Sequence, residues 1–269
     1  HDLSFIDDPT RILRAIRFEQ RYNFRISPKT LELLKEAVKL KMLERVQPHR
    51  LRDELILMLK EERPPKDIKR IEELSGFGFI FPRLYVSKDT YKLLSSIEGQ
   101  IKWFRNEYPQ RRELDTWLVY FMALVDSLRR SDVIAICEKF AFRKGEGKRI
   151  LTYKKAGDKL IRHLSKDKIK ASRIFRLLEP LSYEAILLLK AKSKNRNIKK
   201  YIEDFFEVYN GMRLLCGGDD LRRLGIAPGP YYQKIFTKVL NAKLEGKLFS
   251  KEEELALIKK LVNKARLGS

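Results

Sequence analysis

Four charged side chains near the start of the chain are spaced so that they could act together on one ligand. They are Asp8, Arg11, Arg14 and Arg17, and they lie in a run that reads DDPTRILRAIRF. An Asp followed by Pro indicates a helix start, because Asp accepts from unpaired backbone N–H groups and Pro lacks an N–H that would stay unpaired. We therefore expect a helix with Asp8 as its N-cap residue and Pro9 at its first position.

The apolar residues of the run repeat with helical periodicity. Ile12, Leu13 and Ile16 are expected on one side of the helix and the three arginines on the other. A carboxylate at the N-terminus of a helix and a stripe of guanidinium groups form a dense set of charges. Such a set is typical of a site for an anion or a planar polar ligand.

The spacing of three between Asp8 and Arg11 makes their side chains neighbours on one helix face. A carboxylate accepts hydrogen bonds and a guanidinium donates them, so the pair offers an acceptor beside a donor. Adenine and cytosine present the complementary edge, whereas guanine and uracil present the reverse. The pair could therefore select A and C, and Arg14 and Arg17 could reach the triphosphate or further base atoms. The alternative is a local role, in which Asp8 caps the helix and pairs with Arg11 while Arg14 and Arg17 line a solvated face.

The charge balance of the chain indicates a nucleic-acid partner. Among 269 residues, 58 are Lys or Arg and 36 are Asp or Glu, which gives a formal net charge of +22 spread along the chain. A folded protein that is basic throughout most often faces phosphates. The alternative is a surface that is basic for solubility or growth temperature.

Several other classes are not expected. The longest apolar run, residues 117–125, is far shorter than the roughly 20 residues that span a bilayer. No secretory signal is visible, so we expect no membrane partner. Cys137 and Cys216 are predicted to be free thiols in a reducing compartment, consistent with a cytoplasmic protein. The three histidines lack the spacing of metal ligands.

Helical periodicity predicts an all-α fold with many short helices. Helix starts are expected after Ser27 and at Pro48, and a helix from about Pro65 to Leu74 is expected to stop at Gly76. Further helices are predicted around residues 90–103, 114–129, 131–141, 145–163, 166–178, 182–192, 197–214, 219–224, 230–244 and 250–265. No stretch alternates with the period of a strand.

Two segments near the C-terminus could be mistaken for sites or could be sites. Gly217-Gly218-Asp219-Asp220 is similar to a motif of some RNA polymerases, but a helix follows at once, so Asp219 or Asp220 is predicted to be an N-cap residue. The turn from Gly225 to Pro230 could offer backbone N–H groups to a phosphate, or it could be a tight helix–helix turn.

Basic stretches are candidates for RNA contacts through the phosphate backbone. The residues predicted to bind RNA are Lys190, Lys192, Lys194, Arg196, Lys199, Lys200, Gly225 and Gly229.

The first run resembles the signature of class II tRNA nucleotidyltransferases and bacterial poly(A) polymerases, in which it lies where a catalytic head meets a neck. Asp7 stands where many members carry Glu, which keeps the charge. Further segments similar to the family are Phe24–Pro28, Glu44–Val46, Arg50–Leu55 and Gly217–Pro230, whereas residues 90–215 match only in helical character.

The resemblance implies a role for each matching position and an organisation for the chain. Asp8 and Arg11 would read the incoming base, and Arg14 and Arg17 would contact the nucleotide. The chain would comprise a neck (1–90), a helical body (91–215) and a helical tail (216–269).

The resemblance also implies a reaction whose catalytic carboxylates lie elsewhere. The family's Gly-x-Asp-x-Asp motif, which binds Mg²⁺, is absent from this sequence, so no catalytic residue and no metal ligand is expected here. A head domain in the same or an associated polypeptide would supply them. The implied function is addition of A, or of CCA, to the 3′ end of tRNA from ATP with or without CTP. The alternatives are a poly(A) polymerase and a non-catalytic helical RNA-binding module.

Overall fold

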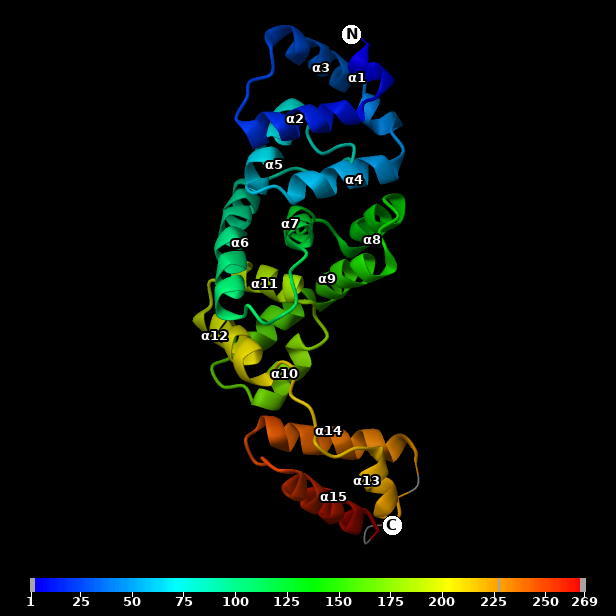
Figure 1. Ribbon diagram of the computed structural model, residues 1–269, viewed down its shortest axis with the longest axis vertical. Coiled ribbons are helices and arrows are strands. Elements are labelled where there is room, and N and C mark those ends of the chain that lie inside the picture. Colours follow the sequence, from blue (N-terminus) through cyan, green and yellow to red (C-terminus); the bar gives the residue numbers. More distant parts are fainter. Residues whose placement is uncertain (1–2, 227, 267–269) are drawn as a thin grey trace. The chain divides into compact units, whose positions relative to one another are not determined.

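A computed structural model describes residues 3–226 and 228–266 of the chain (Figure 1). Within these residues the regular elements are all helices and none is a strand, so the all-α prediction is confirmed. The chain divides into two compact units. Unit 1 comprises the described residues of 1–157 together with 181–194, and unit 2 comprises 158–180 together with the described residues from 195 onward.

The helices follow the predicted order, but some of their ends differ from the predicted ones by as much as about five residues. Unit 1 contains α1 (Ser4–Asp7), α2 (Thr10–Tyr22), α3 (Pro28–Lys39), the 3₁₀ helix η1 (Met42–Arg45), α4 (Pro48–Leu59), α5 (Pro64–Leu74), α6 (Lys88–Glu107), α7 (Thr116–Leu124), α8 (Arg130–Lys139) and α11 (Tyr183–Lys192). The helix α9 (Lys144–Leu164) is interrupted by non-helical backbone at Gly157, where the two units divide. Unit 2 contains α10 (Ala171–Leu178), α12 (Arg196–Asp204), the π-helical turn η2 (Phe205–Tyr209), α13 (Gly218–Arg223), α14 (Pro230–Leu244) and α15 (Lys251–Arg266).

Local sequence signals explain several helix ends. The Ser27 hydroxyl accepts from the Thr30 backbone N–H at 3.3 Å, and Pro28 occupies the first turn of α3. The helix α5 ends at Leu74, and Gly76 follows in the left-handed region with φ of 62°. The short elements α1 and η1 were not predicted, because four residues are too few for a periodic pattern.

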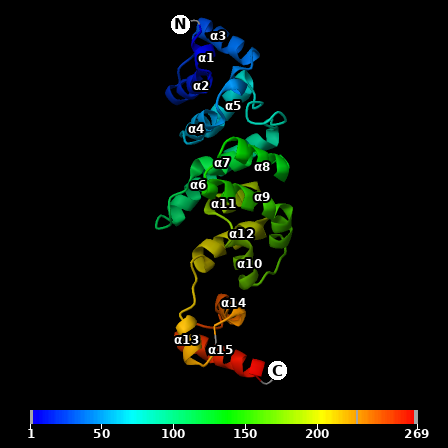
Figure 2. The same cartoon turned by 90° about the vertical axis from the view of Figure 1, so that its right-hand side faces the viewer.

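The centre of unit 1 is formed by two helices that are buried on nearly every side. All residues of α7 from Trp117 to Leu124 are buried, and so are all those of α11 from Glu184 to Lys190. A helix that is apolar all round needs neighbours on all sides. The helices α6, α7 and α11 pack against one another, and α4 packs on α7 (Figure 2).

The helix α2 is held on this core through its apolar side. Ile12, Leu13 and Ile16 are each completely buried, and α2 packs against α4 and α5. Burying three such side chains stabilises this packing by roughly 1.5–3 kcal/mol each. The predicted apolar side of α2 is therefore confirmed, and the packing sets the direction in which its charged residues point.

Unit 2 has a separate apolar cluster between α13, α14 and α15. Its buried members are Cys216, Leu221, Ile235, Val239, Ile258 and Val262. The prediction that Asp219 or Asp220 is an N-cap residue was wrong, because Gly217 occupies the N-cap position of α13. Asp220 lies one turn inside the helix and its carboxylate accepts from the Gly217 backbone N–H at 2.8 Å, so it still satisfies the helix start.

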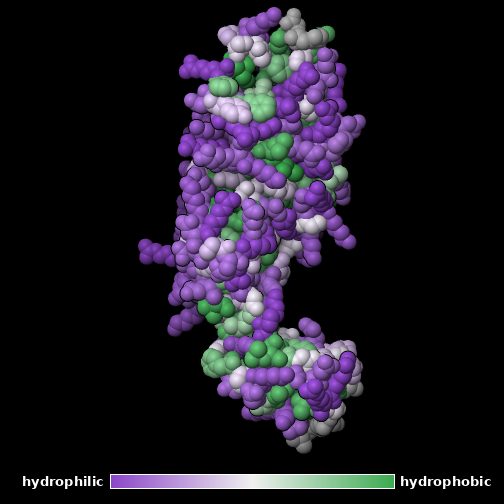
Figure 3. All heavy atoms as spheres, viewed as in Figure 1, coloured by the Kyte–Doolittle hydropathy of each residue, from purple (hydrophilic) through white to green (hydrophobic). Residues whose placement is uncertain are grey.

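The surface is mainly hydrophilic. Figure 3 shows that polar and charged residues cover most of the face in view, with small apolar patches between them. No helix in the described part of the chain is long and apolar enough to cross a membrane. Cys137 and Cys216 are free and buried, as predicted for the thiols.

An ion pair between the half-exposed Arg112 and the buried Glu184 in unit 1 should contribute to stability. Glu184 is completely buried, and its carboxylate accepts from both terminal nitrogens of Arg112, at 2.8 and 2.9 Å, and from the Asp115 backbone N–H at 3.1 Å. Burial raises the pKa of Glu184, but the Arg112 hydrogen bonds outweigh it and the net pKa is below the ordinary value.

We predict that Glu184→Gln lowers the free energy of unfolding by about 1.5–3 kcal/mol, because the buried carboxylate that accepts two hydrogen bonds from Arg112 is lost. The measurement is urea unfolding followed by tryptophan fluorescence, since Trp103 and Trp117 both lie in unit 1. The matched control is Glu98→Gln, which removes an exposed pair with Lys102 and should cost no more than about 0.5 kcal/mol. Equal effects of the two substitutions would contradict the prediction.

Candidate nucleotide-selecting site

The start of α2 differs from the prediction by one residue. The helix begins at Thr10 and Pro9 is its N-cap residue, so Asp8 lies just outside the helix, contrary to expectation. Its carboxylate nevertheless does the work of a cap, because Asp8 Oδ1 accepts from the Thr10 backbone N–H at 3.3 Å and from the Thr10 hydroxyl at 2.6 Å. Pro9 adopts helical angles, and its missing N–H costs nothing because the first N–H groups of a helix have no partner within it.

Asp8 and Arg11 each have a partner from another segment. Asp8 Oδ1 accepts from Arg50 Nη2 at 3.0 Å, and Arg11 Nη1 donates to the Ser4 hydroxyl at 2.6 Å. Burial raises the pKa of Asp8, but the Thr10 hydrogen bonds and the Arg50 guanidinium outweigh it and lower the net pKa. Asp8 therefore stays an acceptor at neutral pH, and Arg11 is an exposed donor whose partner is a neutral hydroxyl.

Arg14 and Arg17 have different surroundings. The side chain of Arg14 is 46% exposed, and its Nη1 lies 3.2 Å from Glu54 Oε1. Arg17 was predicted to contact the nucleotide, with a solvated face as the alternative, but the residue is only 6% exposed. Its guanidinium lies 3.5 Å from Glu54 and 3.4 Å from Glu61, because packing of α2 on α4 turns this side toward two carboxylates. Arg17 is thus a buried ion-pair partner rather than a surface cation.

Sequence reasoning missed the acidic side of this arrangement. Asp67, in the first turn of α5, is 2% exposed, and burial together with the nearby charge of Glu61 raises its pKa to about 7. Within the described residues, neither Asp67 Oδ1 nor Arg17 Nε has a hydrogen-bond partner. An acidic residue in a first helical turn is an ordinary feature of sequences, so nothing local marks Asp67 as buried.

A small hollow opens beside the start of α2. It encloses about 210 Å³ and is lined by Asp8, Thr10, Arg14, Arg50, Asp53 and Glu54. Ligand pockets that enclose a whole small molecule usually measure about 300–1,000 Å³. This hollow can therefore hold the edge of a base or a few polar groups, but not a complete nucleotide.

The basic run from Lys190 to Lys200, which was predicted to bind RNA, contains both buried and exposed side chains. Lys190 was predicted to track phosphates, but it is 4% exposed and its ammonium lies 2.9 Å from the centroid of the Trp103 ring. It sits on a helix that is buried all round, which removes it from the surface. Lys192 donates to Asp126 at 2.7 Å. Lys192 is exposed in spite of this ion pair, and the other exposed members are Lys194 in unit 1 and Arg196, Lys199 and Lys200 in unit 2.

The two predicted glycines play different parts. Gly225 has φ of 71° and its N–H donates to the Arg222 carbonyl at 2.9 Å, so it closes α13 and its N–H is already used. This supports the tight-turn alternative at Gly225 over the phosphate-binding one. Gly229 is the N-cap residue of α14 in extended backbone.

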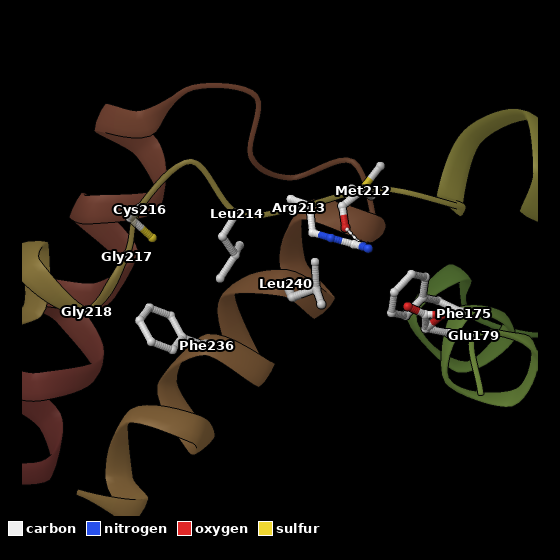
Figure 4. A pocket seen from close by; sticks show the side chains of 10 residues that line it. All are labelled: Phe175, Glu179, Met212, Arg213, Leu214, Cys216, Gly217, Gly218, Phe236 and Leu240. Carbon is white, nitrogen blue, oxygen red and sulfur yellow. Dashed lines mark hydrogen bonds between the residues drawn. The ribbon is translucent and has the colours of Figure 1, made fainter. Parts of the chain in front are cut away.

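An apolar hollow in unit 2 holds none of the predicted site residues. It encloses about 420 Å³ between α10, α14 and the segment that leads into α13. Figure 4 shows Phe236 and Leu240 on α14 and Leu214 on the connecting segment, with Phe175 on α10 and Glu179 directly after it. The guanidinium of Arg213 folds back to donate to the Met212 carbonyl at 3.0 Å.

No cluster of three or more His, Cys, Asp or Glu residues in 3–226 and 228–266 is arranged to hold a metal ion. The start of α2 presents hydrogen-bond acceptors and donors, a combination that can recognise the edge of a planar ligand.

Comparison with known proteins agrees with this chemistry. The profile of a family described as "Probable RNA and SrmB- binding site of polymerase A" matches residues 23–86. An A-adding tRNA nucleotidyltransferase of Geobacter sulfurreducens is 33% identical over 98% of this chain and 31% of its own length. An enzyme of the same name from Aquifex aeolicus is 30% identical over 77% of this chain and 25% of its own length. The chain thus spans less than a third of these two relatives.

Solved structures show the same arrangement of helices. A Thermotoga maritima CCA-adding enzyme complexed with tRNA is 29% identical, with a TM-score of 0.78 over 97% of this chain and 63% of that one. A CCA-adding enzyme complexed with CTP gives a TM-score of 0.79 at 29% identity, over 97% of this chain and 62% of that one. The chain belongs to the family of tRNA nucleotidyltransferases and bacterial poly(A) polymerases.

The raised pKa of Asp67 predicts a pH dependence of stability. Its folded pKa of about 7 lies above the ordinary value of 3.8, so the folded protein holds the proton more tightly than the unfolded chain. The contribution of Asp67 to the free energy of unfolding is fully present below about pH 4 and is lost as the pH rises through 7. We predict that Asp67→Asn flattens this fall and gains about 2–3 kcal/mol relative to the original protein between about pH 5 and pH 7.

The measurement is urea unfolding at both pH values, again followed by tryptophan fluorescence. Asp89→Asn is the matched control, because the side chain of Asp89 is 91% exposed. A stability difference between Asp67→Asn and the original protein that stays constant with pH would show that Asp67 ionises normally.

Proposed function

We propose that the chain is the nucleotide-selecting and RNA-binding part of an A-adding tRNA nucleotidyltransferase. The observation that carries the proposal is that the start of α2 offers an ionised acceptor, Asp8, and an exposed donor, Arg11, three residues apart in the sequence. The A-adding relatives support the choice of substrate, since two of them match 98% of this chain.

Base selection in this proposal works by exchange of partners. Arg11 gives up the Ser4 hydroxyl and donates to the ring nitrogen of the base, while Asp8 accepts from the exocyclic amino group. The Arg11 exchange replaces one hydrogen bond by another, and Asp8 gains one, so little is lost for adenine. Guanine would place its oxygen against the Asp8 carboxylate, and a buried mismatch of this kind costs about 1–3 kcal/mol.

The reaction itself is attack of the tRNA 3′ hydroxyl on the α-phosphate of ATP. Mg²⁺ would stabilise the developing phosphate charge, held by carboxylates of a head domain in the same or an associated polypeptide. The residues of α2 orient the base, and Arg14, which is half-exposed at the hollow, is placed to meet the phosphates. The hollow of about 210 Å³ needs further walls to enclose a nucleotide, which agrees with a site completed by another domain.

The exposed cations Lys194, Arg196, Lys199 and Lys200 are proposed to hold tRNA through its phosphates, in an enzyme of the cytoplasm. CCA addition is the second candidate, because the structures reported above are of CCA-adding enzymes. Poly(A) addition and a purely RNA-binding role remain as the other outcomes of the same assay.

The complete enzyme is tested with tRNA transcripts that end before CCA, after CC, or after CCA. A-adding activity predicts one nucleotide added from ATP to the transcript that ends in CC and none from CTP to the shorter transcript. Addition of three nucleotides to the shorter transcript would identify a CCA-adding enzyme, and untemplated extension of any RNA would identify a poly(A) polymerase. Binding without addition to any transcript would leave only the RNA-binding role.

We predict that Asp8→Ala and Arg11→Ala each lower the preference of kcat/KM for ATP over GTP by roughly five-fold or more. The measurement is single-nucleotide addition with each nucleotide. The control is Arg129→Ala, an exposed arginine at the N-cap position of α8 in unit 1. Full activity with unchanged nucleotide choice in both variants would show that Asp8 and Arg11 are a structural cap.

We predict that replacing Arg196, Lys199 and Lys200 by Gln reduces the dependence of tRNA affinity on salt. The slope of log K against log salt should fall by about 0.7–0.9 for each lost phosphate contact. The matched control replaces Lys69, Lys92 and Lys102, which are equally charged and at least 71% exposed on unit 1. An identical slope in both triple variants would place the RNA elsewhere.

A further inference from the structure

Three aromatic side chains form an exposed row at the C-terminal end of α2. Phe18, Tyr22 and Phe24 are 36%, 53% and 68% exposed. The ring centroids of Phe18 and Tyr22 lie 6.1 Å apart, and those of Tyr22 and Phe24 lie 5.5 Å apart, with interplanar angles of 28° and 29°. Large aromatic rings are normally buried, so an exposed stacked row indicates a binding surface.

The backbone holds this row in place. Asn23 adopts the left-handed region with φ of 51°, and the Phe24 N–H donates to the Glu19 carbonyl at 3.0 Å, which turns the chain back toward α2. The Glu19 carboxylate also accepts from the Ile26 N–H at 3.2 Å and from Arg70 Nε at 2.6 Å. The position of Phe24 beside Tyr22 is therefore built into the fold.

Cations accompany the rings. The Arg14 and Arg17 guanidiniums lie 5.8 and 4.7 Å from the Phe18 centroid, and that of Arg21 lies 5.6 Å from the Tyr22 centroid. A polar hollow of about 440 Å³ adjoins Tyr22. Its cationic lining residues are Arg21, Lys60, Arg63 and Lys66.

Three carboxyl groups also line this hollow, but they leave it with an excess of positive charge. Glu61 is already paired with Arg17 and Arg21, and burial raises the pKa of Asp67 to about 7. Glu62 completes the acidic set, against four cations. The hollow therefore suits an anion.

We propose that Phe18, Tyr22 and Phe24 are a stacking platform for single-stranded RNA, whose phosphates face the cations of the adjoining hollow. This inference rests on the proposed function, because it gives α2 two tasks: its start selects the incoming base and its end holds unpaired nucleotides of the RNA. Bases stack on aromatic rings in any sequence, and arginine beside a ring adds attraction for the strand.

The combination of rings and cations decides between possible occupants. An apolar protein surface on the rings would cover the neighbouring cations and leave them without partners, which is costly. A paired RNA helix keeps its base faces stacked internally and cannot offer them to the rings. An unpaired strand satisfies both features at once.

The test uses the complete enzyme and a short single-stranded oligoribonucleotide that carries 2-aminopurine. Stacking on a ring quenches its fluorescence, and anisotropy of an end label reports affinity. Tyr22→Ala and Phe24→Ala should each weaken binding by roughly five-fold or more and relieve part of the quenching. Tyr22→Phe keeps the ring and should bind within about two-fold of the original protein.

The matched control is Tyr85→Ala, which removes a ring that is 65% exposed elsewhere in unit 1 and should leave binding unchanged. Thermal unfolding at the same midpoint as the original protein confirms that each variant folds, and Tyr22→Leu replaces any variant that does not. Wild-type affinity and quenching in Tyr22→Ala and Phe24→Ala would overturn the platform, and so would an equal loss with Tyr85→Ala or with a fully paired RNA.

The two proposals fail in different ways. Wild-type nucleotide addition together with unchanged oligonucleotide binding in the ring variants would refute only the platform. Absence of nucleotide addition to tRNA by the original enzyme would refute the proposed function, while the oligonucleotide measurements would still decide whether the rings hold RNA.

Discussion

The pairing of Arg17 with Glu54 and Glu61 is the constraint on which the N-terminal site depends. A buried guanidinium is tolerable only when carboxylates neutralise it, and here they come from α4 and the segment after it. The apolar side of α2 would allow some sliding along α4 and α5, whereas three charged groups in hydrogen-bond reach define one register. That register sets where Asp8 and Arg11 lie at one end of the helix and where Tyr22 lies at the other.

Charge satisfaction shapes the whole of unit 1. Each described member of the arginine stripe on α2 already has an oxygen partner, so a ligand has to exchange hydrogen bonds rather than fill empty ones. Because one hydrogen bond replaces another, the empty and occupied states of the site have similar free energies. A ligand that cannot reproduce these contacts leaves arginine N–H groups without acceptors and therefore binds weakly. Pairing is incomplete at Asp67, whose buried Oδ1 has no hydrogen-bond partner among the described residues.

Features that depend on neighbouring residues could be predicted from the sequence, whereas features that depend on tertiary contacts could not. Helix positions such as those beginning at Pro28 and Pro48 follow from capping and periodicity, which act over a few residues. The burial of Arg17, Lys190 and Asp67 depends on which helices meet, and no local pattern carries that information. A lysine in a basic run looks the same whether it faces solvent or lies over the ring of Trp103.

The sequence by itself determined the helical class, the basic character, and the acceptor–donor pair whose motif led to the family. These are properties of residue types and of short spacings, so they survive without knowledge of the contacts. Only the tertiary structure decided that Asp8 binds Arg50, that Arg17 is internal, and that Phe24 turns back to stack on Tyr22. The reason is that the interaction energy of a charged group or an aromatic ring depends on its burial and on its partners. These partners come from segments that are distant in the chain.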